Sequence, residues 1–113
     1  MIDRTTFTNM YENFDKEVID EIIEIFIREY PTRIKELEKD IQAHDFDSLA
    51  KHAHSLKGVI ANFYDEDARQ IAFQLEKKGK SLDSSGLDED LLLLKKACEH
   101  LMAELNEIRK NYR

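Results

Sequence analysis

The residues around the histidine at position 54 suit the chemistry of phosphate. On a helix, with about 100° of rotation per residue, His54 points away from the apolar side. Its neighbours on the same surface are all small, namely Ala50, Gly58 and Ala61. Neutral imidazole is a nucleophile near pH 7, and the ammonium of Lys57, on the next turn, would offset the charge of a phosphoryl group. The pattern predicts a phosphoryl-accepting histidine with room for a large partner to approach.

Gly58 is an unusual residue for the middle of a helix. Glycine there costs about 1 kcal/mol relative to alanine, so its presence suggests that something comes close to the backbone at this position. The simplest interpretation of one histidine on a helix is a solvated surface residue, and Lys57 by itself would be an ordinary surface lysine. The combination of imidazole, lysine and small residues favours the phosphoacceptor interpretation.

The other histidines and the single cysteine do not extend this site. His52 is two positions from His54, which is roughly 160° of rotation, so the two rings cannot share a metal ion. We expect His52 to be a partly buried packing residue. His44 and His100 have no acid or cysteine at a convincing ligand spacing and are expected at the surface. Cys98 falls at a core position of the last predicted helix, which favours an inert buried thiol.

The composition limits the size of the fold and the kind of partner. The chain has 113 residues, with 24 acidic and 17 basic side chains and a formal net charge of −7. This length predicts a single domain over residues 1–113. The acidity argues against binding to nucleic acid or to an anionic membrane. Because the sequence has no signal-peptide pattern and no apolar run of about 18 residues, we expect a soluble, cytoplasmic protein.

Apolar residues at helical spacing predict two long helices in the first half of the chain. The first covers residues 16–44. Pro31 removes a backbone hydrogen bond, so this helix should kink or break near Glu29–Pro31. The second covers residues 46–63, and Asp45 is well placed to cap it.

Two further helices are predicted in the second half. One begins after Asp65 and ends near Gly79, followed by a loop over residues 80–86. Ser85 and Asp88 have the spacing of a capping box, which would open the last helix. Its apolar residues step three and four alternately, so this helix should pack against its neighbours at a shallow angle.

A short helix over Thr6–Tyr11 precedes the long ones, and we expect Phe7 and Met10 to cover one end of the fold. Four amphipathic helices joined by short connections predict an all-α fold. The expected architecture is an antiparallel up-down-up-down four-helix bundle with a short N-terminal helix.

The segment Ala53–Gly58, with the sequence AHSLKG, is continued by Ala61-Asn62 and resembles the signature of histidine-containing phosphotransfer (HPt) domains of multistep two-component signalling. The long apolar helix and the Asp cap before the histidine helix are also similar to the family pattern. Leu75-Glu76 followed by Gly79-Lys80 extends the likeness into the next helix. The resemblance therefore covers nearly the whole chain.

The resemblance implies roles for individual residues. His54 would accept a phosphoryl group from an aspartyl phosphate on one receiver domain and pass it to the aspartate of another. Lys57 matches the family lysine beside the phosphoryl group. Glu76 matches a Glu or Gln that hydrogen-bonds the other ring nitrogen of the active histidine, which would fix the tautomer. The small residues Ala50, Gly58 and Ala61, together with apolar residues of the long helix, would form the receiver-docking surface.

The resemblance also implies the partners of the chain. These would be response-regulator receiver domains and a hybrid sensor histidine kinase. The chain would be a monomeric phosphocarrier rather than an enzyme, because the sequence has no Gly-rich nucleotide loop and hence no ATP site of its own. It would bind no cofactor, since the Mg²⁺ needed for transfer would be held by the receiver.

One residue departs from the family pattern. Many members have glycine where this chain has Tyr64, at the exit of the histidine helix, and this difference bears on the following turn and on which receivers dock. A different class of function also remains open. A helical adaptor could bind a kinase or receiver through the same face without ever carrying phosphate, and a search for acid-labile, base-stable phosphate on the chain would discriminate between the two.

Overall fold

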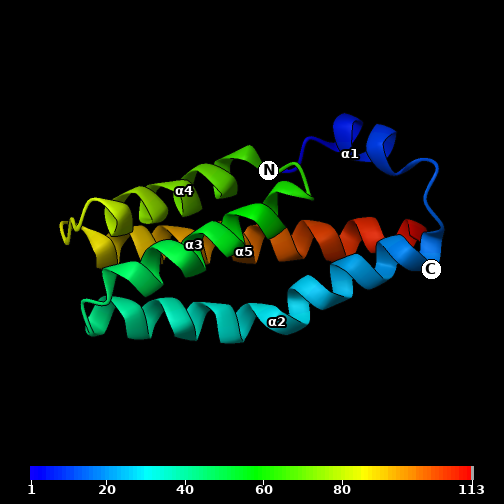
Figure 1. The fold of residues 1–113 in the computed structure, drawn as a ribbon. Coiled ribbons are helices and arrows are strands. Elements are labelled where there is room, and N and C mark those ends of the chain that lie inside the picture. The colour runs from blue at the N-terminus through cyan, green and yellow to red at the C-terminus, as the bar shows by residue number, and fades with distance from the viewer. Residues whose placement is uncertain (113) are drawn as a thin grey trace.

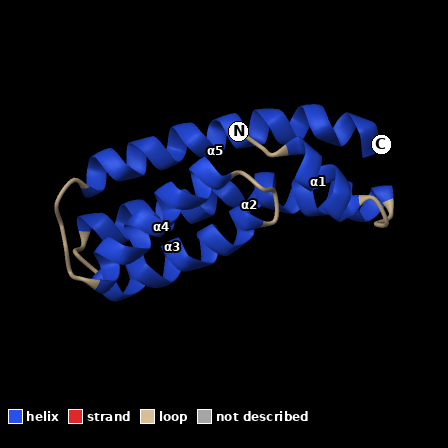
Figure 2. Ribbon diagram, turned by 90° about the horizontal axis from the view of Figure 1, so that it is seen from above, coloured by secondary structure: helices blue, strands red, loops and turns tan. Residues whose placement is uncertain are grey.

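The computed structural model describes residues 1–112, which form helices joined by short loops (Figure 1 and Figure 2). The α-helices are α1 (Arg4–Tyr11), α2 (Lys16–Gln42), α3 (Phe46–Ala61), α4 (Glu66–Lys80) and α5 (Leu87–Arg109), and a short 3-10 helix, η1 (Lys110–Tyr112), follows. No β-strand occurs among the described residues. The all-α prediction is confirmed.

Helices α2 to α5 form an antiparallel bundle, and the described chain as a whole measures 42 × 22 × 19 Å. Figure 1 shows them running alternately in opposite directions, with α3 between α2 and α4 and with α1 across one end. Contacts join α2 to α3, α3 to α4, α4 to α5 and α5 back to α2. The predicted up-down-up-down bundle with a short N-terminal helix is confirmed. None of the described helices combines the length and the apolar character that a membrane span requires.

The apolar stripes identified in the sequence meet in one core. The buried positions of α3, for example, are Leu49, Ala53, Leu56 and Ile60. Cys98 of α5 lies in this core with no solvent exposure, as predicted, and burial raises the pKa of its thiol to about 12. Packing of these stripes fixes which side of each helix faces outward, and so exposes the opposite side of α3.

Aspartate side chains cap the starts of α1, α3 and α4, and Asp3 does so at α1 by accepting from the backbone N–H of Thr6. The side chain of Asp45 accepts a hydrogen bond from the backbone N–H of Ser48 at 3.1 Å, and Asp65 accepts one from Ala68 at the same distance. The starts of α3 and α4 were both predicted. The ends of α2 and α3 come two residues earlier than expected, at Gln42 and Ala61. Helix α2 remains one element through Pro31, and Figure 1 shows its axis bending near the middle.

The capping box predicted at Ser85 and Asp88 is wrong. The residue before α5 is Gly86, in the left-handed conformation with a φ of 65°, and it has no side chain to cap the helix. The hydroxyl of Ser85 instead donates to Asp83 at 2.6 Å. A competing local hydrogen bond therefore removes the expected cap.

The expected place of Met10 is also wrong, because its side chain is 55% exposed. Tyr11 takes the buried position beside Phe7, with a distance of 4.8 Å between ring centroids. The Tyr11 hydroxyl donates to the backbone oxygen of Asn62 at 2.8 Å. This hydrogen bond holds α1 against the end of α3, so Tyr11 rather than Met10 faces the bundle.

Tyr64 adopts the left-handed conformation in the turn between α3 and α4, with a φ of 59°. Glycine takes this conformation without strain, whereas other residues cost about 1–2 kcal/mol. The turn therefore has the backbone conformation that glycine adopts without strain, although the residue here is a tyrosine. Tyr64 packs partly against the core, which provides a compensating contact.

Gly79 allows α4 to lie unusually close to α3. A Cβ at this position would come within 2.8 Å of the backbone nitrogen of Ala50 and 3.0 Å of its Cα. Real side chains do not tolerate such a distance from backbone atoms, so only glycine fits. This close approach brings the residues of α4 within reach of His54 on α3.

Candidate functional site

His54 projects from α3 with its side chain 68% exposed, and Nδ1 of its ring lies 2.9 Å from Oε2 of Glu76 on α4. Because a carboxylate can only accept, Nδ1 carries the proton and donates it to Glu76. The other ring nitrogen, Nε2, is then the one with the free lone pair. The sequence placed these two residues on flanks of neighbouring helices, and the structure brings them together.

Glu76 is buried, with its side chain 2% exposed, and two lysines balance its charge. Nζ of Lys57 lies 2.6 Å from Oε1, and Nζ of Lys80 lies 3.1 Å from Oε2. Oε1 accepts no hydrogen bond of suitable angle from the described residues, so its contact with Lys57 is ionic. The carboxylate thus gathers two cations and one imidazole at the surface between α3 and α4.

The charge state of Glu76 follows from this surrounding. Burial by itself would raise the pKa of the carboxyl group, but Lys57, Lys80 and the His54 ring stabilise the ionised form and hold the pKa at about 2. Glu76 is therefore a carboxylate at neutral pH. Its charge keeps the proton on Nδ1 of the His54 ring.

Lys57 is held in place by two contacts. Besides the ion pair with Glu76, its ammonium lies over the ring of Phe73, 4.7 Å from the centroid. Its side chain is only 19% exposed, unlike that of Lys80, which is 66% exposed. The two cations near His54 therefore differ, since Lys57 is partly buried with two contacts and Lys80 is mostly exposed with one ion pair.

The small residues predicted around His54 have different surroundings. Gly58 is exposed, and a Cβ there would meet nothing within 4 Å, so packing within the described chain does not require glycine. Ala61 is exposed as well. Ala50 is half-buried, because it supports the close approach of Gly79. Among these three residues, Gly58 and Ala61 are therefore open to solvent, whereas Ala50 is partly covered by α4.

A shallow pocket of about 390 Å³ lies beside the imidazole. It is lined by Asp47, Ala50, Lys51, His54, Glu76 and Lys80, from α3 and α4. Lys80 is a site residue that sequence reasoning missed. The signal was present, because Lys80 lies four positions after Glu76 and so on the same surface of one helix.

His52 is partly buried, as predicted, but it forms ion pairs rather than only packing. Its Nδ1 lies 2.5 Å from Oδ2 of Asp40, and its Nε2 lies 2.8 Å from Oε2 of Glu36. Both carboxylates belong to α2, so the ring bridges α2 and α3. Both ring nitrogens of His52 thus face carboxylates, whereas in His54 only Nδ1 does. His44 and His100 are exposed, in agreement with the sequence.

No cluster of three metal-binding side chains occurs among the described residues. The site is an exposed imidazole, a buried carboxylate and two lysines. Such an arrangement can hold a proton at one ring nitrogen, present the other as a nucleophile and place positive charge beside a bound phosphoryl group.

A comparison with family models identifies the class. The model of the Hpt domain matches residues 21–109, which is most of the chain, and the chain therefore belongs to the Hpt domain family. Members act in two-component signalling as histidine-containing phosphocarriers, and they interact with receiver domains and kinases in phosphorelays. Neither a search of curated proteins nor a search of solved structures found a match.

Proposed function

We propose that this chain is a phosphorelay intermediate in which Nε2 of His54 accepts a phosphoryl group from a receiver aspartyl phosphate and passes it to another receiver aspartate. In the first step the N–P bond forms at Nε2 while the P–O bond to the receiver aspartate breaks. The carboxylate leaves with the electron pair of that bond. The second step is the reverse reaction with a different receiver.

The single observation that carries the proposal is the contact between Nδ1 of His54 and Glu76 at 2.9 Å. Since the proton stays on Nδ1, the lone pair of Nε2 is available in an exposed position. When Nε2 becomes phosphorylated, the ring gains positive character, which the carboxylate of Glu76 stabilises. The same contact therefore supports both the acceptance and the later release of the phosphoryl group.

Lys57 and Lys80 would neutralise part of the phosphoryl charge. Both ammonium groups lie within 3.1 Å of Glu76 and so start close to the ring. Mg²⁺ would be provided by the receiver, at the site of the aspartyl phosphate. The contribution of this chain is mainly the positioning of a nucleophile.

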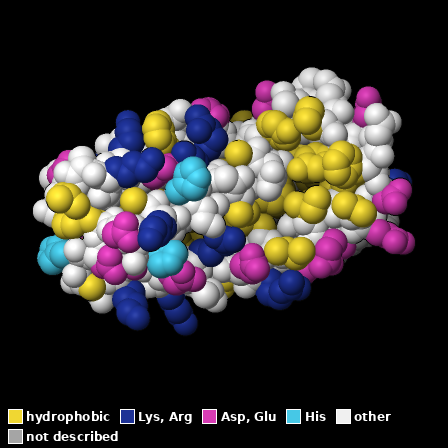
Figure 3. Space-filling model, in the orientation of Figure 1, with side chains coloured by type: hydrophobic (Ala, Val, Ile, Leu, Met, Phe, Trp, Pro, Cys, Tyr) yellow, Lys and Arg dark blue, Asp and Glu magenta, His cyan; other side chains and the backbone are white. Residues whose placement is uncertain are grey.

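The docking surface would include Ala50, Gly58 and Ala61 and would continue over apolar residues of α2. In Figure 3 hydrophobic side chains gather between α1 and the first half of α2, on the face that also shows histidine side chains. Phe14, just before α2, and Val18 within it are about half exposed. Exposed apolar groups on the face that also carries histidine side chains favour a protein partner over a small molecule.

The proposal is tested by incubating the chain with a phosphorylated receiver and measuring acid-labile, base-stable phosphate. We expect the label on the wild-type chain and its absence from His54→Gln, which should stay folded because His54 is exposed. Binding of receivers without any label on the wild type would overturn the relay and support the adaptor function instead.

A further inference from the structure

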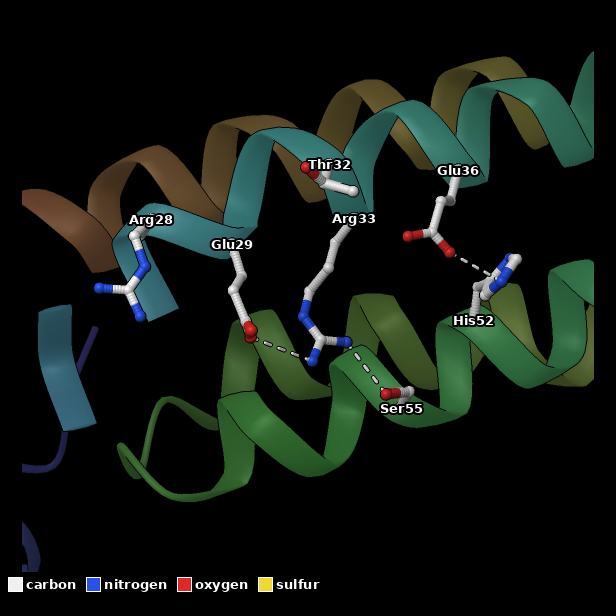
Figure 4. Close-up of a pocket in the computed structure, with 7 residues that line it drawn as sticks. All are labelled: Arg28, Glu29, Thr32, Arg33, Glu36, His52 and Ser55. Carbon is white, nitrogen blue, oxygen red and sulfur yellow. Dashed lines mark hydrogen bonds and ion pairs between the residues drawn. The ribbon is translucent and has the colours of Figure 1, made fainter. Parts of the chain in front are cut away.

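A second groove, also of about 390 Å³, lies on the other side of α3, between this helix and α2. The charged and hydrogen-bonding side chains that line it and carry the argument are Arg28, Glu29, Arg33 and Glu36 from α2, and His52 and Ser55 from α3 (Figure 4). Figure 4 shows Arg28 at one end of the groove, His52 at the other and Arg33 between them. The groove does not contain the residues of the proposed phosphoacceptor site.

The charges in this groove do not all have partners. Glu36 pairs with His52 at 2.8 Å, and Glu29 pairs with Arg33 at 3.6 Å. Arg33 also donates to the hydroxyl of Ser55 at 3.0 Å, which holds its guanidinium across the groove. Arg28 has no ion pair or hydrogen bond among the described residues, and its side chain is exposed. One positive charge therefore remains without a partner, in a chain whose net charge is −7.

The groove is next to the phosphoacceptor. Ser55 lines it and directly follows His54 in α3. A specific protein interface covers about 800 Å² on each partner. A receiver that covers His54 therefore also covers Ser55, and an interface of this size extends along the groove toward Arg28.

We propose that Arg28 and Arg33 form a recognition site for a carboxylate side chain of the docked receiver, and that this contact determines which receivers the chain serves. The inference rests on the proposed function. Guanidinium groups bind carboxylates with two parallel hydrogen bonds, and Arg33 is already held in place by Ser55. A receiver with a neutral or basic residue at this point would leave Arg28 unpaired on docking. Such an uncompensated charge lowers the affinity for the wrong partner.

The test measures phosphoryl transfer from a panel of phosphorylated receivers over a range of receiver concentrations. For receivers that serve the wild type, Arg28→Glu should raise the half-saturating concentration by about tenfold, and Arg28→Ala by about threefold. The maximal rate should change less than about twofold, because Arg28 does not touch His54 or Glu76. The effect should become smaller as the salt concentration rises.

The matched control is Lys96→Glu, which makes the same change of charge on the exposed side of α5. It should leave the half-saturating concentration unchanged. Equal values for Arg28→Glu and Lys96→Glu with every receiver would overturn the proposal. A loss of maximal rate without a change in half-saturation would also overturn it.

Reversing the charges on both proteins identifies the receiver carboxylate that contacts Arg28. Acidic residues around the receiver's phosphorylation site are replaced by lysine one at a time, and one replacement should restore transfer to Arg28→Glu while weakening the wild type. If no replacement does so, the carboxylate contact is wrong. A failure of the relay itself is distinguishable, because the wild type would then carry no phosphate. In that case receiver binding is compared between His54→Gln and the double variant His54→Gln/Arg28→Glu, which still tests the groove.

Discussion

Glu76 is almost completely buried, yet one of its carboxylate oxygens lies 2.9 Å from Nδ1 of the exposed His54. A buried carboxylate is stable only when its charge is compensated. Lys57 and Lys80 provide the compensation from two different helices. The same charges that keep Glu76 ionised are therefore the ones that a phosphoryl group on His54 would meet.

Removal of the Glu76 carboxylate should slow phosphoryl transfer. Glu76→Gln keeps an oxygen that can accept from Nδ1 but loses the charge, and we expect a rate about tenfold lower. Glu76→Ala loses the acceptor altogether and allows the other tautomer, so the rate should fall about 100-fold. Single-turnover transfer from a labelled receiver measures both rates. Transfer by Glu76→Ala at the wild-type rate would contradict the role of this contact.

The low pKa of Glu76 also predicts how stability depends on pH. The carboxyl group has a pKa of about 2 in the folded chain against an ordinary value of 4.5. Its contribution to the free energy of unfolding is therefore complete above about pH 4.5 and is lost as the pH falls toward 2. Denaturant titrations at both ends of this pH range should show that the free energy of unfolding falls further for the wild type than for Glu76→Gln. Parallel losses in the two proteins would show that Glu76 is not stabilised as described.

Lys57 and Lys80 should have unequal effects when each is replaced by alanine. Lys57→Ala leaves Oε1 of a buried carboxylate without a charge partner, so we expect a loss of about 1–3 kcal/mol in unfolding free energy. Lys80 is mostly exposed, and Lys80→Ala should cost less than about 1 kcal/mol. Lys57→Ala should also slow transfer by about tenfold or more while receiver binding is retained. Urea denaturation, transfer rates and binding measurements separate these effects, and an unchanged transfer rate would remove Lys57 from the site.

Much of the fold could be predicted because it depends on local pattern. The cap at Asp45 and the buried side of α3 follow from residue type and spacing alone. The errors arose where two local preferences compete. Ser85 could cap α5 or bond to Asp83, and the left-handed Gly86 decides for the latter. Met10 and Tyr11 both could have faced the bundle, and the partner of the Tyr11 hydroxyl lies 51 residues away.

The site was predictable to the extent that its residues share one helix surface or a family pattern. His54 and Lys57 lie on adjacent turns, and Glu76 lies on the flank of a clear apolar stripe. The ion pairs of His52 were missed because its carboxylate partners are on α2, and no spacing within α3 reveals them. The groove with Arg28 was missed for the same reason, since its two walls come from different helices.

The bridge made by His52 should contribute to stability independently of phosphoryl transfer. Asp40 is buried, and His52→Ala would leave its carboxylate without the ring. We expect the free energy of unfolding to fall by about 1–3 kcal/mol, since a buried acceptor loses its partner. His100→Ala, at an exposed position of α5, is the control and should be nearly neutral. Thermal and urea denaturation measure both, and an equal effect of the two substitutions would contradict the bridge.

Gly58 in α3 and Gly79 near the end of α4 should respond in opposite ways to alanine. In a helix interior, as at Gly58, alanine gains about 1 kcal/mol of helix propensity over glycine, and it gains less at the last turn, as at Gly79. At Gly58 nothing opposes this gain, because a Cβ meets no atom within 4 Å, so Gly58→Ala should raise the free energy of unfolding by about 0.5–1 kcal/mol. At Gly79 the new Cβ would meet the backbone of Ala50 at 2.8 Å, and the forced separation of α3 and α4 should give a net loss of about 1–3 kcal/mol.

A further substitution tests where the collision at Gly79 lies. Because the nearest atoms are the backbone nitrogen and Cα of Ala50, Ala50→Gly removes only the third contact, at 3.0 Å, and should not restore Gly79→Ala. Urea denaturation of the single and double variants gives the comparison. Since α4 carries Glu76, Gly79→Ala should also weaken the hydrogen bond to His54, which the chemical shift of the Nδ1 proton reports. A stable Gly79→Ala variant with an unchanged Nδ1 resonance would show that the close approach of the two helices is not needed to build the site.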